Sequence, residues 1–197
     1  MRITSGCSAE LRPPLMTRLA RYRHRVFVET LGWQLQCRDA LEWDQFDRED
    51  TLYVIAQNAV GDVIGTARLL PTTRPYLLSE VFPVLLNGAA PPQSPTVWEL
   101  SRFAAVDFGG TTGSALDQFS SPITTGLLRA ASRCAMAQGA QRMVTVSPLR
   151  VVVPAESAAF ARCTRAPPCE TVSAAVPGAL ICRVGLASET SRSPPWP

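Results

Sequence analysis

The segment LYVIAQNAVGDVIGTARLL, which spans residues 52–70, indicates the fold of the chain. Its two halves, Leu52–Asn58 and Val63–Leu70, are short and mostly apolar, and Gly61 and Asp62 lie between them. Two apolar runs separated by turn-forming residues are typical of antiparallel strands in a hairpin. The sequence therefore predicts a β-hairpin in this part of the chain.

Segments on both sides of the hairpin extend the pattern. Apolar residues recur at helical spacing in Leu15–Leu31 and again in Pro122–Gln138. Val97–Ala105 and Met143–Ser147 have the composition of strands, and Leu77–Leu86 is a shorter apolar element with helical character. The order helix, hairpin, strand, helix and strand predicts an α/β fold with a mostly antiparallel sheet.

The composition suits one folded domain with an apolar core. Apolar residues make up 46% of the 197 residues and charged residues 18%, which is unlike a disordered chain. The net charge of +3 is too small to indicate a nucleic-acid-binding surface. All 19 basic residues are arginines. Because a GC-rich gene would by itself favour arginine, each one has to be argued from its position.

Several classes of protein are disfavoured by what the sequence lacks. It has no apolar run of about 18 residues, so no membrane span is expected, and residues 1–14 have no apolar signal core. We therefore expect a cytoplasmic protein with reduced cysteines. His24 is the only histidine, and no cysteine pair has the spacing of metal ligands. Neither a metal site nor a Ser-His-Asp hydrolase is predicted.

The hexapeptide Trp98–Phe103, WELSRF, places charged groups in a strand that otherwise has the pattern of a buried one. Ionised side chains are rarely buried unless they are paired or used in chemistry. In a regular strand Glu99 and Ser101 face one side and Arg102 faces the other. Both charged groups can act at one site only at a β-bulge or at a strand end.

Six ionisable residues from separate elements form a candidate site: Arg25, Asp44, Asp47, Arg68, Glu99 and Arg102. If they converge, their arginines and carboxylates form a paired network in a cleft. Such a network suits a zwitterionic ligand, because guanidinium groups bind a carboxylate while carboxylates hold an ammonium group. The alternative is that these residues are ordinary surface charges.

Three aromatic residues also have two interpretations. Phe27, Trp33 and Phe82 could stack on a nucleoside ring or on a cation. Aromatic side chains also fill apolar cores, and the spacing alone leaves both roles open.

Six motifs in a fixed order carry a resemblance to a known family. They are Arg25–Phe27 (RVF), Leu31–Trp33 (LGW), Glu42–Asp50 (E-x-D-Q-F-D-x-x-D), Gly65–Thr72 (G-x-x-R-L-L-P-T), Val81–Pro83 (VFP) and Trp98–Phe103 (WELSRF). In their order and approximate spacing, over about residues 20–148, they closely resemble the acyl-homoserine-lactone synthases. These are the Lux-type autoinducer synthases that Gram-negative bacteria use in quorum sensing.

The resemblance implies a fold like that of the N-acetyltransferases, with a mixed, mostly antiparallel sheet flanked by helices. It also implies an acyltransferase whose substrates are S-adenosylmethionine and an acyl chain delivered by acyl carrier protein. The methionine amine would attack the acyl thioester. The methionine carboxylate would then attack its own γ-carbon, expel methylthioadenosine and close the lactone. S-adenosylmethionine is thus implied as a substrate rather than a cofactor, and acyl carrier protein as the partner.

The same resemblance implies roles for individual residues. Glu99 is implied as the proton acceptor for the amine, and Arg102 as the second catalytic residue. The residues implied around the S-adenosylmethionine pocket are Arg25, Phe27, Trp33, Asp44, Asp47, Arg68 and Phe82. The residues implied along the acyl channel are Ser101, Phe103, Met143 and Thr145.

The resemblance ends near residue 150. We therefore expect a synthase core over residues 1–150 and an atypical segment over residues 151–197, with a weak strand at Ala179–Leu186. This segment is either a divergent tail or the product of a shifted reading frame, and the shift is favoured. If it fails to complete the acyl pocket, the chain would be a weakly active or binding-only member of the family. A coenzyme A-dependent acetyltransferase is disfavoured, because no glycine-rich pyrophosphate loop precedes Pro122.

Overall fold

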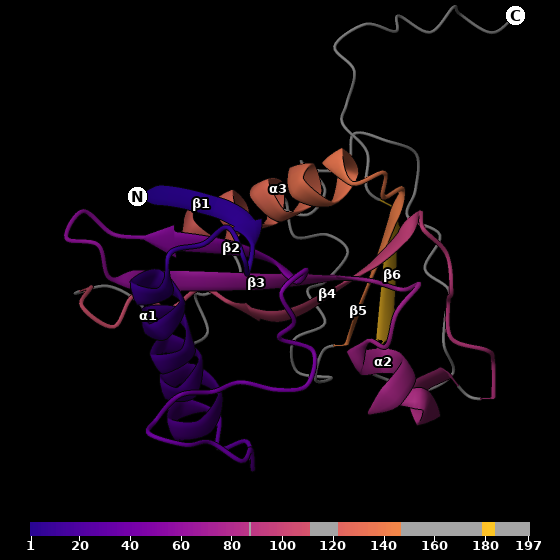
Figure 1. The fold of residues 1–197 in the computed structure, drawn as a ribbon, viewed down its shortest axis with the longest axis horizontal. Helices are drawn as coiled ribbons and strands as arrows, with labels where there is room; N and C mark the ends of the chain where they lie inside the picture. The colour runs from indigo at the N-terminus through magenta and orange to yellow at the C-terminus, as the bar shows by residue number, and fades with distance from the viewer. Residues whose placement is uncertain (87, 111–121, 147–178, 184–197) are drawn as a thin grey trace, which may run out of the picture.

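The computed structural model describes residues 1–86, 88–110, 122–146 and 179–183 (Figure 1). Its strands are β1 (Arg2–Cys7), β2 (Leu52–Gln57), β3 (Val63–Pro71), β4 (Val97–Ala104), β5 (Arg142–Val146) and β6 (Ala179–Arg183). Its helices are α1 (Pro13–Arg23), the π-helix η1 (His24–Thr30), α2 (Leu77–Glu80), the 3₁₀-helix η2 (Pro83–Leu86) and α3 (Pro122–Ala137).

The described strands form one sheet in the order of the sequence, β1-β2-β3-β4-β5-β6. Neighbouring strands are antiparallel except β4 and β5, which are parallel. Figure 1 shows α3 above the sheet and α1 below it. The predicted class is therefore confirmed: an α/β fold with a mixed, mostly antiparallel sheet flanked by helices. The predicted hairpin is β2 and β3.

Alternating side chains of β2 show how both faces of the sheet are covered. Val54 and Ala56 lie in the apolar cluster that contains residues of α3, whereas Tyr53 and Ile55 lie in the cluster that contains residues of α1. Because successive side chains of a strand point to opposite faces, helices on both sides make the whole strand apolar. This explains why the sequence shows continuous apolar runs rather than alternation.

Two elements differ from the prediction. β1 is absent from it, because Arg2–Cys7 is a polar, half-exposed edge strand that is held by its main-chain pairing with β2. The predicted helix Leu15–Leu31 begins earlier, at Pro13, and changes at His24 into a π-helix. A π-helical turn shifts the faces of the side chains that follow it. This shift bears directly on the candidate site.

Strand β4 carries the bulge that the hexapeptide requires. Ser101 pairs with Arg68 and Ala104 pairs with Thr66, so β4 contains one residue more than β3 between these pairs. Arg102 has a φ of 48°, in the left-handed region. The bulge lets Arg102 act on the same side as Ser101, which a regular strand would forbid.

The parallel strands β4 and β5 part after a short pairing. Val97–Leu100 pairs with Arg142–Thr145, and beyond Leu100 the one described partner of β4 is β3. On the other side of β5, the antiparallel strand β6 agrees with the strand expected at Ala179–Leu186. The change of character expected at residue 150 lies outside the described residues.

Within the described ranges, no helix is long and apolar enough to cross a membrane.

Candidate active site

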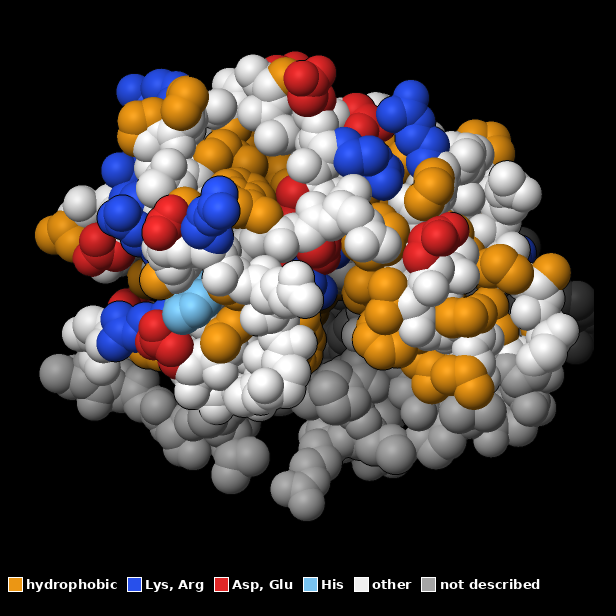
Figure 2. Space-filling view, turned by 60° about the horizontal axis from the view of Figure 1, so that its bottom comes forward, with side chains coloured by type: hydrophobic (Ala, Val, Ile, Leu, Met, Phe, Trp, Pro, Cys, Tyr) orange, Lys and Arg blue, Asp and Glu red, His pale blue; other side chains and the backbone are white. Residues whose placement is uncertain are grey.

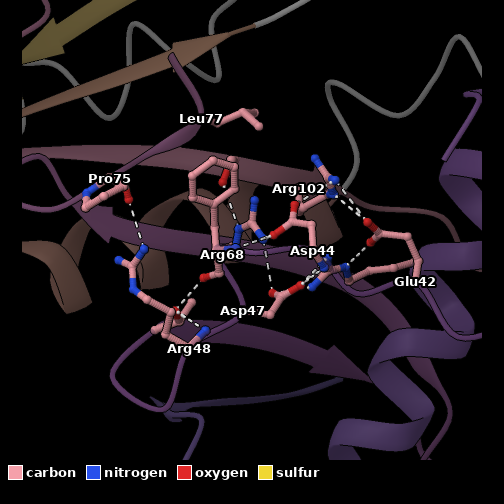
Figure 3. A network of polar contacts seen from close by, with 12 residues as sticks. Glu42, Asp44, Asp47, Arg48, Arg68, Pro75, Leu77 and Arg102 are labelled. Carbon is pink, nitrogen blue, oxygen red and sulfur yellow. Dashed lines mark hydrogen bonds and ion pairs between the residues drawn. The ribbon is translucent and has the colours of Figure 1, made fainter. Parts of the chain in front are cut away.

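Six charged side chains meet on the α1 side of the sheet and form alternating ion pairs (Figure 3). The arginines are Arg23, Arg68 and Arg102, and the carboxylates are Glu42, Asp44 and Asp47. They come from α1, from β3, from β4 and from the loop between η1 and β2. In the space-filling view, acidic and basic atoms are visible at the bottom of a hollow near the centre of this face (Figure 2).

Arg23 is the fully buried centre of one half of this network. Its Nη1 and Nη2 donate to Asp47 Oδ1 at 2.8 Å and Oδ2 at 2.9 Å, and its Nε donates to Glu42 Oε2. Burial alone would lower the pKa of Arg23, but Asp47 and Glu42 hold it above its ordinary value. The side chain is therefore a permanent cation that holds two carboxylates in place.

Arg68 and Arg102 share Asp44. Arg68 Nη1 donates to Asp44 Oδ1 at 2.6 Å, and Arg102 Nη2 donates to Asp44 Oδ2 at 2.8 Å. Arg102 also donates twice to Glu42 Oε1, from Nε at 3.2 Å and from Nη2 at 2.9 Å. Arg68 Nε donates to Ser101 Oγ at 3.1 Å. The bulge in β4 is thus what brings the guanidinium of Arg102 to the carboxylate that Arg68 binds.

Arg68 keeps one donor free of these contacts. Its Nη2 atom is buried and has no hydrogen-bond partner within the part of the chain that the structure describes. A buried donor without an acceptor costs free energy, so such atoms are rare in folded proteins. Arg68 thus keeps a donor available beside the ion pairs.

Asp47 is held as an anion by two arginines and a tyrosine hydroxyl. It binds Arg23 and Arg68, and it accepts a hydrogen bond from the Tyr53 hydroxyl at 2.6 Å. Burial would raise its pKa, but Arg23 and Arg68 hold the pKa of this carboxyl well below its usual range. Asp47 also accepts the backbone N–H of Asp44, which fixes the loop between the two carboxylates.

The network is buried and its charges balance, so for Asp44, Asp47, Arg68 and Arg102 the alternative of ordinary surface charges is wrong. Buried ions need a partner for each charge, because desolvation is otherwise costly.

Two members of the network are absent from the predicted site. Arg23 could have been found, because it lies four residues after the buried Leu19 on the apolar face of the helix. Glu42 could have been found from its place beside Asp44 in the E-x-D motif.

The prediction that Arg25 belongs to the network is wrong. Arg25 is exposed, and none of the ion pairs among the described residues includes it. Its guanidinium lies over the ring of Phe108, with 3.9 Å between Cζ and the ring centroid. Residues two apart on a helix do not face the same way, so only Arg23 is directed to the sheet.

Two of the predicted aromatic residues form a stacked pair beside the network. The rings of Phe27 and Trp33 lie 4.8 Å apart at 25°, and Arg102 Cζ is 5.6 Å from the first and 5.7 Å from the second. Phe27 lies in the π-helix η1, and Trp33 follows the end of that helix. The backbone N–H of Trp33 donates to the carbonyl oxygen of Phe27, which helps to bring the two rings together. Phe82 is 36% exposed, and no described contact joins it to the network.

Glu99 lies on the same face of the sheet as Arg68 and Ser101, but it is outside the ion pairs. Its Oε2 accepts the N–H of Leu77 at 2.9 Å, and its Oε1 accepts the N–H of Leu78 at 2.7 Å. Burial raises the pKa of Glu99 from 4.5 to about 7, against the lowering effect of the Leu78 and Leu77 N–H groups. Glu99 is therefore poised to exchange a proton near neutral pH.

The residues predicted along the acyl channel are divided between two regions. Ser101 contacts the network through Arg68, and Thr145 pairs with Leu100 at the point where β4 and β5 part. Met143 is buried in the apolar cluster under α3, and Phe103 packs against that cluster. Only Ser101 is thus joined to the charged site by a described contact.

No group of three or more histidine, cysteine, aspartate or glutamate side chains in the described ranges could hold a metal ion. The charged site is a largely buried network of paired ions beside two stacked aromatic rings. A family described as autoinducer synthase matches residues 10–154.

The chain belongs to the autoinducer synthase family. An acyl-homoserine-lactone synthase of Acinetobacter nosocomialis is 48% identical over 172 residues, which cover 87% of this chain and 93% of that protein. The crystal structure of TofI in a ternary complex with an inhibitor and MTA is 37% identical, with a TM-score of 0.67 over 93% of this chain and 91% of TofI.

A further member of the family is solved with two small molecules. The CoA-dependent acyl-homoserine lactone synthase BjaI, with SAM and isopentyl-CoA, is 31% identical to this chain. Its TM-score is 0.61 over 73% of this chain and 65% of BjaI.

Proposed function

We propose that the chain is an acyl-homoserine-lactone synthase that acylates the amine of S-adenosylmethionine and closes the product to a lactone. The observation that carries the proposal is the charge-balanced network of Arg68, Arg102 and Asp44 beside the Phe27–Trp33 stack. A zwitterion with a cationic sulfur and a nucleoside matches these groups in charge and in shape. The named relatives support the same activity.

The carboxylate of the substrate would bind where Arg68 has its free donor. Arg68 Nη2 is buried without a partner in the described residues, and a carboxylate oxygen satisfies such a donor with a charge-assisted hydrogen bond. Asp44, which Arg68 and Arg102 already hold, lies next to this position and suits the ammonium group. The ion pair of Arg23 and Asp47 would hold Asp44 and Arg68 in this arrangement.

The adenosyl group and the sulfonium would lie against the Phe27–Trp33 stack. An aromatic face attracts a cation, and a purine stacks on it. TofI is solved with MTA, the adenosyl product of such a reaction, which supports this assignment.

The acyl transfer requires a neutral amine, and Glu99 is the proposed proton acceptor. A base works best when its pKa is close to the operating pH, and the pKa of Glu99 is about 7. The amine lone pair then forms a bond to the thioester carbonyl carbon. The carbon–sulfur bond breaks, and the carrier thiolate leaves and takes up a proton. Backbone N–H groups of β4 beyond Leu100, where β5 has parted, are the proposed donors to the oxyanion.

Lactone closure is a positioning task. A carboxylate oxygen of the acylated substrate attacks the γ-carbon, and the bond from that carbon to the sulfonium breaks with its electron pair going to sulfur. Methylthioadenosine leaves as a neutral product. Arg68 and Arg102 would orient the carboxylate for this attack, which is where geometry lowers the barrier. The thioester and the sulfonium are both activated, so the proposed reaction needs no further cofactor.

We propose acyl carrier protein as the acyl donor and the cytoplasm as the location. BjaI is described as CoA-dependent, so members of the family differ in their donor. The sequence lacks a glycine-rich pyrophosphate loop before Pro122, which favours a carrier protein over coenzyme A.

Mass spectrometry of the reaction tests the proposal. The full chain is incubated with S-adenosylmethionine and with an acyl group on either carrier protein or coenzyme A. We expect an acyl-homoserine lactone and methylthioadenosine in equal amounts with the carrier protein. Glu99→Gln should lose turnover while it still binds S-adenosylmethionine. Binding without any product from the wild-type chain would instead identify a binding-only member of the family.

A further inference from the structure

The exposed residue Arg25 makes a contact that the charged network does not use. Its guanidinium Cζ is 3.9 Å from the centroid of the Phe108 ring, and the ring of Tyr22 meets Phe108 edge-on at 6.1 Å and 68°. The Tyr22 hydroxyl accepts the N–H of Val106 at 2.8 Å. Two residues at the junction of α1 and η1 thus hold the segment of residues 105–108.

This segment is the continuation of the strand that carries Arg102. Ala104 is the last residue of β4 that pairs with β3, and residues 105–108 follow it directly. Val106 and Phe108 pack against the apolar cluster that contains Phe27, with Trp33 on the same cluster. The contacts of Arg25 and Tyr22 therefore connect the end of β4 with the element that carries the aromatic stack.

The strained residue Arg102 lies shortly before this segment. Its backbone is left-handed, with a φ of 48°, and a branched or long side chain adopts this conformation only when the surroundings impose it. On one side Ser101 is fixed by its pairing with Arg68. On the other side Ala104 pairs with Thr66 and Ala105 is buried in the cluster under α3, and the next held points are the Val106 N–H and the Phe108 ring.

We propose that Arg25 is a positioning residue that clamps residues 105–108 onto α1 and η1, and so fixes the bulge at Arg102, without contacting the substrate. A planar guanidinium stacks on an aromatic face, whereas an ammonium group does so less well. This inference rests on the proposed function only for its effect on S-adenosylmethionine. The clamp itself is testable without any substrate.

Hydrogen exchange of the Val106 amide tests the clamp in the full chain. Loss of an exposed cation–π contact is expected to raise the exchange rate of this amide by about two- to fivefold in Arg25→Ala. Arg25→Lys should have an intermediate effect. The control is Arg21→Ala, which removes another exposed arginine of α1 and should leave the rate unchanged. Equal rates in wild type and Arg25→Ala would overturn the clamp.

A double-mutant cycle separates positioning from direct contact with the substrate. The dissociation constant of S-adenosylmethionine is measured for Arg25→Ala, Phe108→Leu and the double variant, each with an unchanged melting temperature. A clamp predicts that each single change weakens binding by about two- to fivefold and that the double variant is no weaker. Additive effects, or no effect of Phe108→Leu, would overturn it. If the wild-type chain does not bind S-adenosylmethionine, the proposed function fails while the exchange result still decides the clamp.

Discussion

Arg102 and Glu42 are 60 residues apart in the sequence and are joined by two hydrogen bonds from one guanidinium to one carboxylate oxygen. The other oxygen of Glu42 binds Arg23. Glu42, with 1% of its surface exposed, is thus the link that ties the end of the first helix to the bulge in β4. The stability of the site depends on this link.

Arg23→Met is expected to lower the free energy of unfolding by about 3–5 kcal/mol, because it leaves Glu42 and Asp47 buried without their shared cation. Urea unfolding monitored by tryptophan fluorescence measures the change. Arg21→Met, on the exposed side of the same helix, is the control and should stay within about 0.5 kcal/mol of wild type. Similar losses in both variants would show that the network does not depend on Arg23.

Replacement of Arg102 should reverse the usual order of glycine and alanine in a strand. Both Arg102→Gly and Arg102→Ala remove the ion pairs, but only glycine adopts a φ of 48° without steric cost. We expect the glycine variant to be more stable than the alanine variant by about 1 kcal/mol in urea unfolding. At Leu100, in the regular part of β4, the alanine variant should be the more stable one. An alanine variant of Arg102 as stable as the glycine variant would contradict the left-handed bulge.

Glu99 should make stability fall with pH near neutrality. Burial raises its pKa from 4.5 to about 7 in the folded chain, so between these values the folded state binds more protons than the unfolded state. The associated stability is complete below pH 4.5 and is lost as the pH rises through 7, by about 3 kcal/mol in total. Urea unfolding at pH 5 and pH 8 should show this loss in wild type. Glu99→Gln should show a smaller difference, and an unchanged difference would exclude Glu99 as its source.

Gly65→Ala is expected to destabilise the contact between β3 and α3. A Cβ atom at Gly65 would lie 2.5 Å from Leu127 Cδ1 and 3.2 Å from the carbonyl oxygen of Ala104, and Leu127 is fully buried. Overpacking of this kind costs about 1–3 kcal/mol, which a thermal melt detects. Gly109→Ala is the matched control, because its nearest neighbour would be 3.6 Å away. A melting temperature unaffected by Gly65→Ala would mean that α3 can move away from the sheet.

The sequence by itself determined the secondary structure around the site. The hairpin at residues 52–70 and the strands around WELSRF and Val144 follow from short apolar runs, and the two main helices follow from apolar periodicity. Both signals depend only on near neighbours in the chain. The carboxylates Asp44 and Asp47 and the arginines Arg68 and Arg102 are also visible in the sequence, because charge within apolar or aromatic surroundings needs a partner.

Only the tertiary structure decided which groups pair. Arg23 rather than Arg25 enters the network, because a shift of two positions turns a helical side chain away from the sheet and the helix changes to a π-helix at His24. The left-handed bulge at Arg102 and the two N–H groups bound to Glu99 depend on strands and turns distant in sequence. Local patterns specify helices and strands, whereas a buried charge is placed by its partners, and here those partners are as far as 60 residues away.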